Sequence, residues 1–318
     1  MPELPEVHTT VESLKKTVVG LTIKDVWSEY DSDHYKGKNN IKDRKYFKKF
    51  KKAVRNKKIN NVERKGKHVL IHLSDNLTVL THMKMTGHYL YGRYKKTTAR
   101  EKRDLWSNWT AIEKGPLRDD PFNRFIKLVF VLSNDNCLTL SDMRKFATVF
   151  LYRTDNPPKE LTDLGADPLD KDFTFKKFLD LLPYRSVRPI KQVLLDQSII
   201  SGIGNIYSDE ILWHSDVHPQ NLTGALPRSS LYKIYSSMKI ILREGISLEG
   251  DSMSDYRLPN GEKGSYQHNH KVYRKNGQLC SRRGCKGKIQ KMTIGGRSAH
   301  FCNKHQKLYH QASDSHET

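Results

Sequence analysis

The first residues of the chain carry an amine and two carboxylates that could act together in covalent catalysis. The sequence begins Met1-Pro2-Glu3-Leu4-Pro5-Glu6, so removal of Met1 by an aminopeptidase would expose Pro2 as a secondary amine. An α-amino group has a pKa of about 8, which leaves a useful fraction neutral and nucleophilic near neutral pH. Such an amine condenses with an aldehyde-level carbon to a charged iminium. Glu3 could then act as a general acid, with Glu6 as a second carboxylate close by; the alternative is a solvated arm.

Three of the four cysteines lie close together near the end of the sequence. Four residues separate Cys280 from Cys285, and two residues separate Cys302 from His305. The segment between the pairs contains Gly295-Gly296, so we expect a β-hairpin that brings the two pairs together. Thiolate and imidazole ligands at this spacing are typical of tetrahedral zinc, and we predict one structural zinc ion bound by these four side chains.

Two further histidines leave the fourth zinc ligand open. His300 and His310 lie on either side of the second pair, although the two-residue spacing favours His305. Because such a small hairpin cannot bury much core, zinc would stabilise its fold. The remaining cysteine, Cys137, falls in a strand-like run, and we interpret it as a buried core thiol.

The charge of the chain indicates a polyanionic partner. Its 318 residues include 56 Lys+Arg against 35 Asp+Glu, a formal net charge of +21. This favours nucleic acid first and an anionic membrane surface second. Apolar runs long enough to span a membrane are absent, and the acidic N-terminus does not resemble a signal peptide. We therefore expect a soluble intracellular protein with no membrane partner.

The two halves of the sequence follow different periodicities. A helical pattern over residues 8–19 precedes short strand-like runs separated by turns, which is typical of an antiparallel sandwich. The strand-like runs span residues 21–26, 57–64, 69–73, 77–82, 89–91, 126–132, 137–141 and 148–152. The later periods are helical and span residues 174–182, 190–197, 205–214 and 229–245. Between them, residues 93–124 are polar, and we interpret them as an irregular long loop or insertion.

Three motifs now occur in one order along the chain. They are the N-terminal Pro-Glu-Leu-Pro-Glu-Val, the run Gly202-Ile203-Gly204-Asn205-Ile206-Tyr207 in the helical half, and the terminal zinc hairpin. Together they resemble the formamidopyrimidine-DNA glycosylase (Fpg) family over nearly the whole chain. The resemblance implies an α+β multidomain fold with an N-terminal antiparallel β-sandwich and a C-terminal helix–two-turns–helix domain that carries a β-hairpin zinc finger. We expect a β-sandwich domain over residues 1–155, a linker over 156–171, a helix–two-turns–helix domain over 172–266 with a lesion-capping loop at 250–266, a zinc finger over 267–310 and a disordered tail over 311–318.

The resemblance also implies an activity. The family is a bifunctional DNA glycosylase/AP lyase that excises oxidised purines, 8-oxoguanine and formamidopyrimidines, from damaged double-stranded DNA in base excision repair. It then cuts the abasic strand by β,δ-elimination. We expect a monomer that works in the cytoplasm or nucleoid of a bacterium.

Six matched positions acquire catalytic or phosphate-binding roles from the resemblance. Pro2 would attack the sugar C1′, and Glu3 would help to open the sugar ring with support from Glu6. The phosphates around the lesion would be held by Lys67, Asn205 and Arg297. For Asn205, an ordinary helix cap is the alternative.

Three more matched positions would replace the flipped base. Met85 would fill the void, Arg144 would hydrogen-bond the orphaned base, and Phe146 would wedge the stack. Taken alone, each has a simpler interpretation: Met85 and Phe146 as core residues, and Arg144 as an ion-pair partner of Asp142.

The chain departs from the family pattern at several positions. His305 stands where the family usually has a fourth cysteine, Lys145 and Ala147 replace the common Arg and Gly, and residues 93–124 are longer than usual, with no role that the sequence assigns. An endonuclease VIII-like glycosylase for oxidised pyrimidines is the nearest alternative. Leu4 and the glycine-rich segment 252–266 argue against it. A non-catalytic zinc-dependent DNA-binding protein is the alternative from another class.

Overall fold

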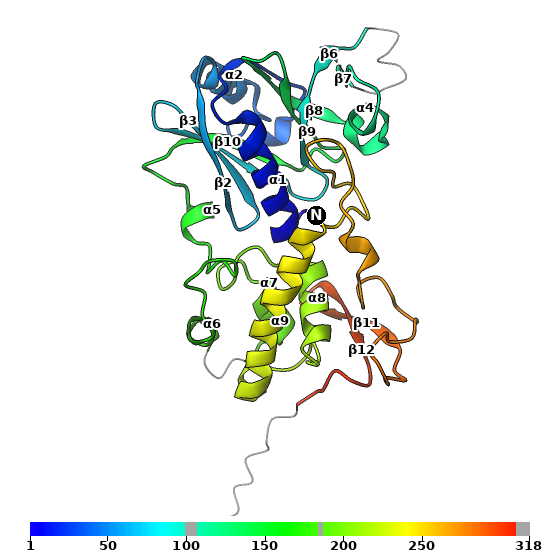
Figure 1. The fold of residues 1–318 in the computed structure, drawn as a ribbon. Helices are drawn as coiled ribbons and strands as arrows, with labels where there is room; N and C mark the ends of the chain where they lie inside the picture. The colour runs from blue at the N-terminus through cyan, green and yellow to red at the C-terminus, as the bar shows by residue number, and fades with distance from the viewer. Residues whose placement is uncertain (99–106, 184–186, 310–318) are drawn as a thin grey trace, which may run out of the picture. The chain divides into compact units, whose positions relative to one another are not determined.

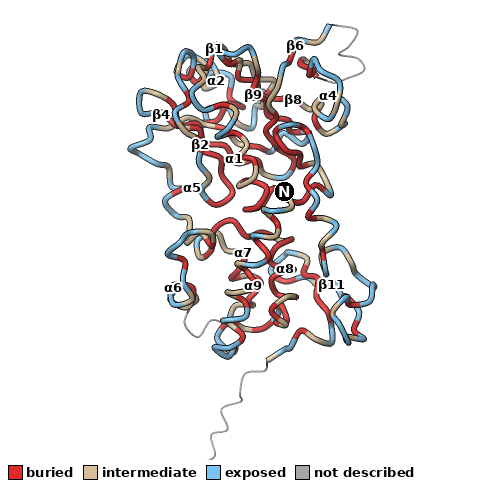
Figure 2. Tube along the Cα trace, in the orientation of Figure 1, coloured by how far each residue is buried: buried red, intermediate tan, exposed pale blue. Residues whose placement is uncertain are grey.

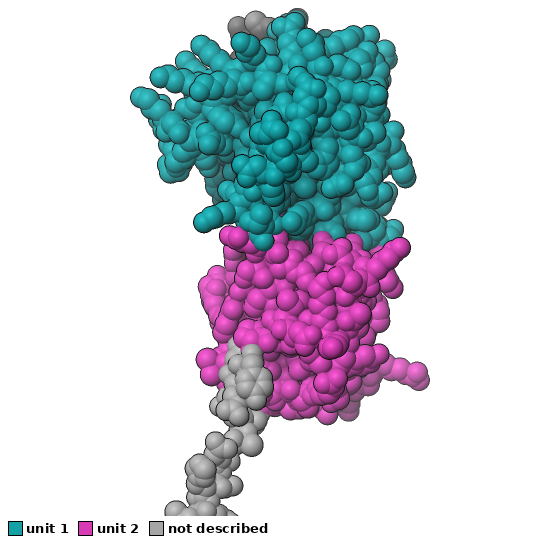
Figure 3. Space-filling model, turned by 90° about the vertical axis from the view of Figure 1, so that its left-hand side faces the viewer, with its two compact units in different colours: residues 1–162, 245–267 teal, residues 163–244, 268–318 magenta. Residues whose placement is uncertain are grey.

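The computed structural model describes residues 1–98, 107–183 and 187–309. The chain divides into two compact units, which are coloured separately in Figure 3. Unit 1 comprises residues 1–162 and 245–267, and unit 2 comprises residues 163–244 and 268–318. His310 and the expected tail, 311–318, lie outside the described residues.

The units differ from the expected domain boundaries at one segment. We assigned the loop 250–266 to the helical domain because it follows the last helical run. In the structure this loop belongs to unit 1, because its backbone and side chains bond to the N-terminal helix and to residues 107–124, as described below.

Two antiparallel sheets of four strands form a β-sandwich in unit 1 (Figure 1). The first sheet has the order β1 (Ile23–Ser28), β8 (Ile126–Leu132), β9 (Cys137–Ser141) and β5 (His88–Gly92). The second has the order β10 (Thr148–Arg153), β4 (Leu77–His82), β3 (His68–Leu73) and β2 (Ile59–Lys65). Apolar residues from both sheets share one buried core, visible along the strands in Figure 2. The expected sandwich is confirmed, with strand ends within two residues of the predicted runs.

Helix α1 (Leu4–Val18) begins four residues before the helical pattern that the sequence shows. The apolar period becomes visible only after the first turn, but Glu3 and Glu6 form a reciprocal capping box that starts the helix earlier. A second helix, α2 (Arg44–Val54), follows the short 3₁₀ helix η1 (Asp33–Tyr35) and carries six of the 56 Lys+Arg residues. It buries Phe50 in the core and leaves its lysines on the outer face.

The described part of the segment 93–124 is regular, so the expectation of an irregular loop is wrong there. Strand β6 (Tyr94–Lys96) pairs with β7 (Trp109–Ala111), and α4 (Pro116–Asp119) and η2 (Pro121–Arg124) follow. Tyr94 and Trp109 are buried in a small core of their own on the outer side of the first sheet. Their aromatic area supplies the apolar burial that the polar composition had hidden.

Unit 2 contains short helices and the terminal hairpin. Its elements are α6 (Phe175–Leu181), α7 (Ile190–Leu195), α8 (Asn205–His214), η3 (Thr223–Ala225), most of α9 (Arg228–Ser247), β11 (Ile289–Ile294) and β12 (Arg297–Cys302). Two short elements remain: α5 (Lys159–Thr162) belongs to unit 1, and η4 (Tyr266–His268) has its first two residues in unit 1. Gly295 and Gly296 form the turn of the hairpin, as expected. Within the described ranges, no helix combines the length and apolarity needed to cross a bilayer.

Candidate active site and metal centre

The N-terminus of α1 fixes the carboxylates that follow Pro2. Glu3 and Glu6 are buried, and the Glu3 backbone N–H donates to Glu6 Oε2 at 2.7 Å. The other carboxylate oxygen, Glu6 Oε1, accepts from the backbone N–H of Asp251 at 2.8 Å. Glu6 therefore holds the backbone beside Pro2 in place, which is a positioning task, and Glu3 is the carboxylate next to Pro2.

The loop that follows α9 is attached to the N-terminus of α1. Gly250 approaches Glu6 so closely that an added Cβ would lie 2.8 Å from Glu6 Cγ. The Tyr256 hydroxyl donates to the backbone oxygen of Glu6 at 3.0 Å. Burial raises the pKa of Tyr256 far above its usual value, so this hydroxyl stays a donor at physiological pH. The sequence did not reveal this contact between the two ends of unit 1.

Met85, Arg144 and Phe146 meet on two neighbouring loops of the sandwich, and we call them the wedge cluster. Arg144 Nη1 lies 3.3 Å from Met85 Sδ, and the guanidinium carbon lies 4.5 Å from the Phe146 ring centroid. Met85 is 43% exposed and Phe146 is 44% exposed. The simpler interpretation of both as core residues is therefore wrong.

A buried carboxylate that the sequence analysis used only as an alternative ion-pair partner holds these loops. Asp142 Oδ2 accepts from the Tyr30 hydroxyl at 2.7 Å and from the Ala147 N–H at 2.9 Å. Its Oδ1 accepts from the Thr86 hydroxyl at 2.5 Å, and Thr86 Oγ1 accepts from the Arg144 N–H at 3.1 Å. Asp142 thus binds the backbone of its own loop at Ala147 and the Thr86 side chain of the other loop, while the Arg144 guanidinium stays on Met85 and Phe146.

Lys67 lies at the turn between β2 and β3, beside two buried imidazoles. The rings of His68 and His82 are in edge contact, with centroids 4.7 Å apart. Burial lowers the pKa of His68 to about 4 and that of His82 to about 2, so both rings are neutral at physiological pH. Lys42 supports the loop that carries Arg144 and Phe146, because its Nζ donates to Lys145 O at 2.6 Å. Lys42 was not predicted from the sequence.

In unit 2, Asn205 and Arg297 lie close together through α8 and β12. Gly204 is the N-cap of α8, so Asn205 is not the cap. Its side-chain Nδ2 instead donates at 3.1 Å to Oγ of Ser298, the neighbour of Arg297 on β12. Arg297 is exposed, and its neighbour Ser298 contacts the first residue of α8, a helix N-terminus being a place where anions bind favourably.

Buried carboxylates of α8 attach the hairpin to the helices. Asp209 forms a fully buried ion pair with Lys191 and accepts from both the backbone N–H (3.0 Å) and Nδ1 (2.9 Å) of His300. Glu210 accepts the backbone N–H groups of residues 271–273. Neither carboxylate was predicted from the sequence; the available signal was a pair of adjacent acids followed by the apolar run Ile211-Leu212-Trp213.

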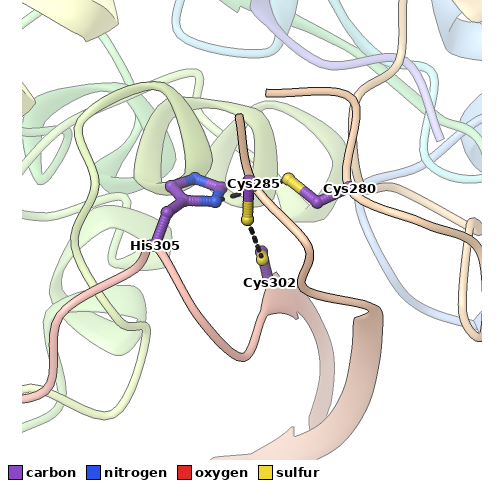
Figure 4. A group of neighbouring side chains, drawn as sticks. All are labelled: Cys280, Cys285, Cys302 and His305. Carbon is purple, nitrogen blue, oxygen red and sulfur yellow. Dashed lines mark hydrogen bonds between the residues drawn. The ribbon is translucent and has the colours of Figure 1, made fainter. Parts of the chain in front are cut away.

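The predicted metal ligands meet at the base of the hairpin (Figure 4). The ligand atoms of Cys280, Cys285, Cys302 and His305 all lie within 4.8 Å of one another. Two sulfurs bound to tetrahedral zinc at about 2.3 Å would be about 3.8 Å apart. Here the Cys285 and Cys302 sulfurs are 3.6 Å apart, and His305 Nδ1 is 3.4 Å from the Cys280 sulfur. The donor set and its dimensions therefore fit zinc.

The orientation of His305 also suits a ligand. Its Nε2 lies 3.2 Å from the Trp213 carbonyl oxygen, to which an Nε2–H can donate a hydrogen bond, and Nδ1 faces the sulfurs. Burial lowers the pKa of His305, which favours the neutral ring that binds metal. His300 is occupied by Asp209 and is not part of the cluster. Among the described residues, the cluster is completed by His305.

Comparisons with known proteins agree with this arrangement. The model of the formamidopyrimidine-DNA glycosylase N-terminal domain matches residues 1–149, and that of the H2TH domain of the same enzymes matches residues 164–257. The formamidopyrimidine-DNA glycosylase of Pelotomaculum thermopropionicum is 33% identical over 310 residues, 97% of this chain and 100% of that protein.

Two solved structures of Lactococcus lactis Fpg are similar over 96% of this chain. A mutant bound to DNA containing Fapy-dG has a TM-score of 0.77, 31% identity and 100% of its chain covered. A complex with abasic-site DNA has a TM-score of 0.76, 30% identity and 99% of its chain covered. With the fold, the two matched domains and a full-length relative in agreement, the chain belongs to the formamidopyrimidine-DNA glycosylase family of DNA-repair enzymes.

Proposed function

We propose that this DNA glycosylase is bifunctional: it removes oxidised purines from duplex DNA with Pro2 as nucleophile and then acts as an AP lyase. The observation that carries the proposal is the buried pair Glu3 and Glu6 at the start of α1, directly after Pro2. Their capping box fixes the backbone directly after the prospective amine. A solvated arm would need no such fixed geometry.

The chemistry follows from the amine and the acid beside it. The neutral Pro2 nitrogen would attack the sugar C1′, and the base would leave with the electron pair of its glycosidic bond. The proton lost from the Pro2 nitrogen would neutralise the departing base. Glu3 would donate a proton to the ring oxygen as the sugar opens to an iminium with Pro2. Because the iminium acidifies the C2′ protons, the two flanking phosphates could leave in turn by β- and δ-elimination.

The wedge cluster supports an extruded substrate. An enzyme that acts at C1′ must take the nucleotide out of the stack, and the resulting gap must be filled. Met85 and Phe146 are exposed apolar side chains held on fixed loops, and Arg144 offers hydrogen-bond donors between them. We assign Met85 to the void, Phe146 to the neighbouring stack and Arg144 to the orphaned base.

Phosphate contacts would come from each unit separately. Lys67 would hold phosphate in unit 1, and Asn205 with Arg297 would do so in unit 2. One zinc ion bound by the Cys₃His cluster would serve a structural purpose, keeping the hairpin that carries Arg297 folded. Its residues fit this task because the cluster lies at the base of β11 and β12.

Oxidised purines are the favoured substrate class. The similar Lactococcus lactis structure that contains Fapy-dG supports this choice, as does the well-formed loop 250–266 in unit 1. We further infer a monomer acting in the cytoplasm or nucleoid of a bacterium, consistent with the bacterial sources of its relatives.

A strand-cleavage assay with borohydride trapping tests the proposal. Duplexes carrying 8-oxoguanine, a formamidopyrimidine or an oxidised pyrimidine are compared, and we expect cleavage of the first two to be faster. Borohydride should trap a protein–DNA adduct from Met1-free protein, Pro2→Gly should trap little, and Glu3→Gln should bind lesion DNA but not excise the base. Equal trapping by Pro2→Gly would move the nucleophile elsewhere, with Lys67 as the next candidate. Retained Met1 in active protein, seen by intact mass, would exclude Pro2.

A further inference from the structure

The described part of the long segment in the first half of the chain forms a platform, residues 107–124, for the capping loop, residues 250–266. Both belong to unit 1. Arg257 of the loop donates from Nε to Asp120 Oδ2 of the platform at 2.8 Å. The side chains are only 2% and 12% exposed, and the guanidinium also lies over the Phe122 ring, 4.8 Å from its centroid. An ion pair this deeply buried joins the two segments tightly, because separating it would leave a desolvated charge.

A buried amide makes the second contact. Asn123 Nδ2 donates to Pro116 O within the platform at 2.8 Å and to Gly261 O of the loop at 3.0 Å. Its Oδ1 accepts from His88 Nε2 at 3.1 Å, at the start of β5. One side chain therefore ties the loop, the platform and the first sheet together, with both of its amide protons and its oxygen engaged.

Backbone packing makes the third contact. Gly261 has φ +89°, and an added Cβ would lie 2.5 Å from the backbone nitrogen of Leu117. Beside it, the Tyr91 N–H at the free edge of the first sheet donates to Pro259 O at 2.7 Å. The loop thus lies against the platform with no room for a side chain at the closest point.

These contacts leave residues 253–255 outside, as they do residues 260, 262, 263 and 265 farther along the loop. The start of the loop is held by Glu6, through the N–H of Asp251, and residues 256–259 are buried. Between them Met253 is 40% exposed. Residues 253–255 therefore lie between two fixed residues: Asp251, which is bound by Glu6, and Arg257, which is bound by Asp120 of the platform.

We propose that the platform is a specificity element, which pre-orders the capping loop so that residues 253–255 meet an extruded damaged base without a further ordering cost. The inference rests on the proposed function, since it concerns the base that this site would receive. A pre-ordered loop favours binding because the entropy of fixing it is lost on folding rather than on DNA association. It favours substrates that still carry the base, because an abasic site gives residues 253–255 nothing to contact.

The docking itself is tested by hydrogen exchange in the full chain without DNA. Asp120→Asn keeps an oxygen for the Phe122 N–H, which Asp120 Oδ1 now accepts at 2.9 Å, but removes the charge facing Arg257. We expect amide exchange across residues 250–266 to accelerate about tenfold or more. Asp119→Asn is the matched control, because Asp119 accepts from Gly115 within the same turn. It should leave the loop unchanged, and equal exchange in the two variants would overturn the docking.

A glycine pair provides an independent route if Asp120→Asn proves poorly folded. Gly261→Ala and Gly20→Ala impose the same backbone strain, since φ is +89° and +88°, but Gly20 has open space where Gly261 meets Leu117. Only Gly261→Ala should loosen residues 250–266. Equal loop exchange in both variants would show that the contact with the platform does not hold the loop.

The specificity is tested by comparing two substrates. Asp120→Asn should lower kcat/KM about tenfold on an 8-oxoguanine duplex and change abasic-site cleavage by less than about twofold. Equal losses on both substrates, or no loss on either with a loosened loop, would overturn the specificity element. If the wild-type protein cleaves neither duplex, the proposed function fails, while the exchange comparison still decides whether the platform holds the loop.

Discussion

The wedge cluster and the cysteine hairpin are both short segments that bury little core, but different interactions hold them. Asp142 fixes the wedge loops with hydrogen bonds from Tyr30, Thr86 and Ala147. The hairpin instead brings four metal-binding side chains to one point. A hydrogen bond to a charged group contributes about 1.5–3 kcal/mol, whereas structural zinc contributes about 10–16 kcal/mol to the folding of small domains. Single substitutions can weaken the hydrogen bonds to Asp142 one at a time, whereas loss of the metal removes the whole stabilisation of the hairpin.

Removing the metal should have the largest effect and should be confined to unit 2. We expect about one zinc per chain, with Cys302→Ser or a strong chelator unfolding the hairpin and weakening lesion-DNA binding by about a hundredfold, because Arg297 loses its support. Metal analysis and DNA titration measure this. His305→Ala should also lower the zinc content, and His300→Ala should retain it. Full zinc in His305→Ala would mean that another residue completes the site.

Asp142→Asn should loosen the wedge loops and leave the metal content unchanged. The amide can accept fewer of the hydrogen bonds that now converge on the two oxygens, and we expect a loss of about 3 kcal/mol in unfolding free energy. Denaturant unfolding measures it. Asp155→Asn is a matched control, since that carboxylate is exposed and pairs with Arg153 at the surface, where such pairs contribute little. A similar loss of unfolding free energy in both variants would show that Asp142 does not hold the wedge loops.

His88, which contacts Thr86 in the loop that carries Met85, should contribute to the pH dependence of unit 1 together with His68 and His82. Burial lowers the pKa of His88 to about 4, whereas the unfolded chain titrates near 6.5. Between these values the unfolded state binds the extra proton, so stability is full above pH 6.5 and falls as the pH drops toward 4. The loss should be on the order of 3 kcal/mol. His88→Gln should flatten this part of the pH profile of unfolding at constant zinc content; an unaltered slope would assign the loss to other groups.

Arg144→Ala should have the smallest energetic effect and the most specific one. As a donor, Arg144 matches the acceptor edge of cytosine, so excision of 8-oxoguanine should be faster opposite cytosine than opposite adenine. Loss of one such contact costs about 1–3 kcal/mol of discrimination. The variant should flatten the cytosine/adenine ratio while keeping wild-type stability, because its guanidinium contacts only exposed side chains. An unchanged ratio would exclude Arg144 from reading the opposite base.

Local patterns predicted what local physics controls. Short strand-like runs bounded by turn residues located strands such as β4, β8 and β9 at their observed bounds, because turn residues interrupt a strand whatever its partners are. The spacing of Cys280, Cys285, Cys302 and His305 predicted a metal cluster because each pair lies within one turn. The start of α1 was missed, since two glutamates and a proline replace the apolar period there.

The tertiary structure alone decided which polar groups meet. Tyr30 reaches Asp142 across 112 residues, and Asp251 reaches Glu6 across 245 residues. Hydrogen bonds between such distant single residues leave no period or spacing in a sequence, because each depends on how separate elements pack. The same holds for Asp209, whose hydrogen bond to His300 keeps that histidine out of the metal cluster. It also holds for the platform 107–124: its sequence resembles a polar loop, and only the structure shows that Arg257 and Gly261 pack against it. The sequence by itself therefore determined the sandwich and the hairpin and predicted a chemistry for the N-terminus, and packing decided which side chains lie together there.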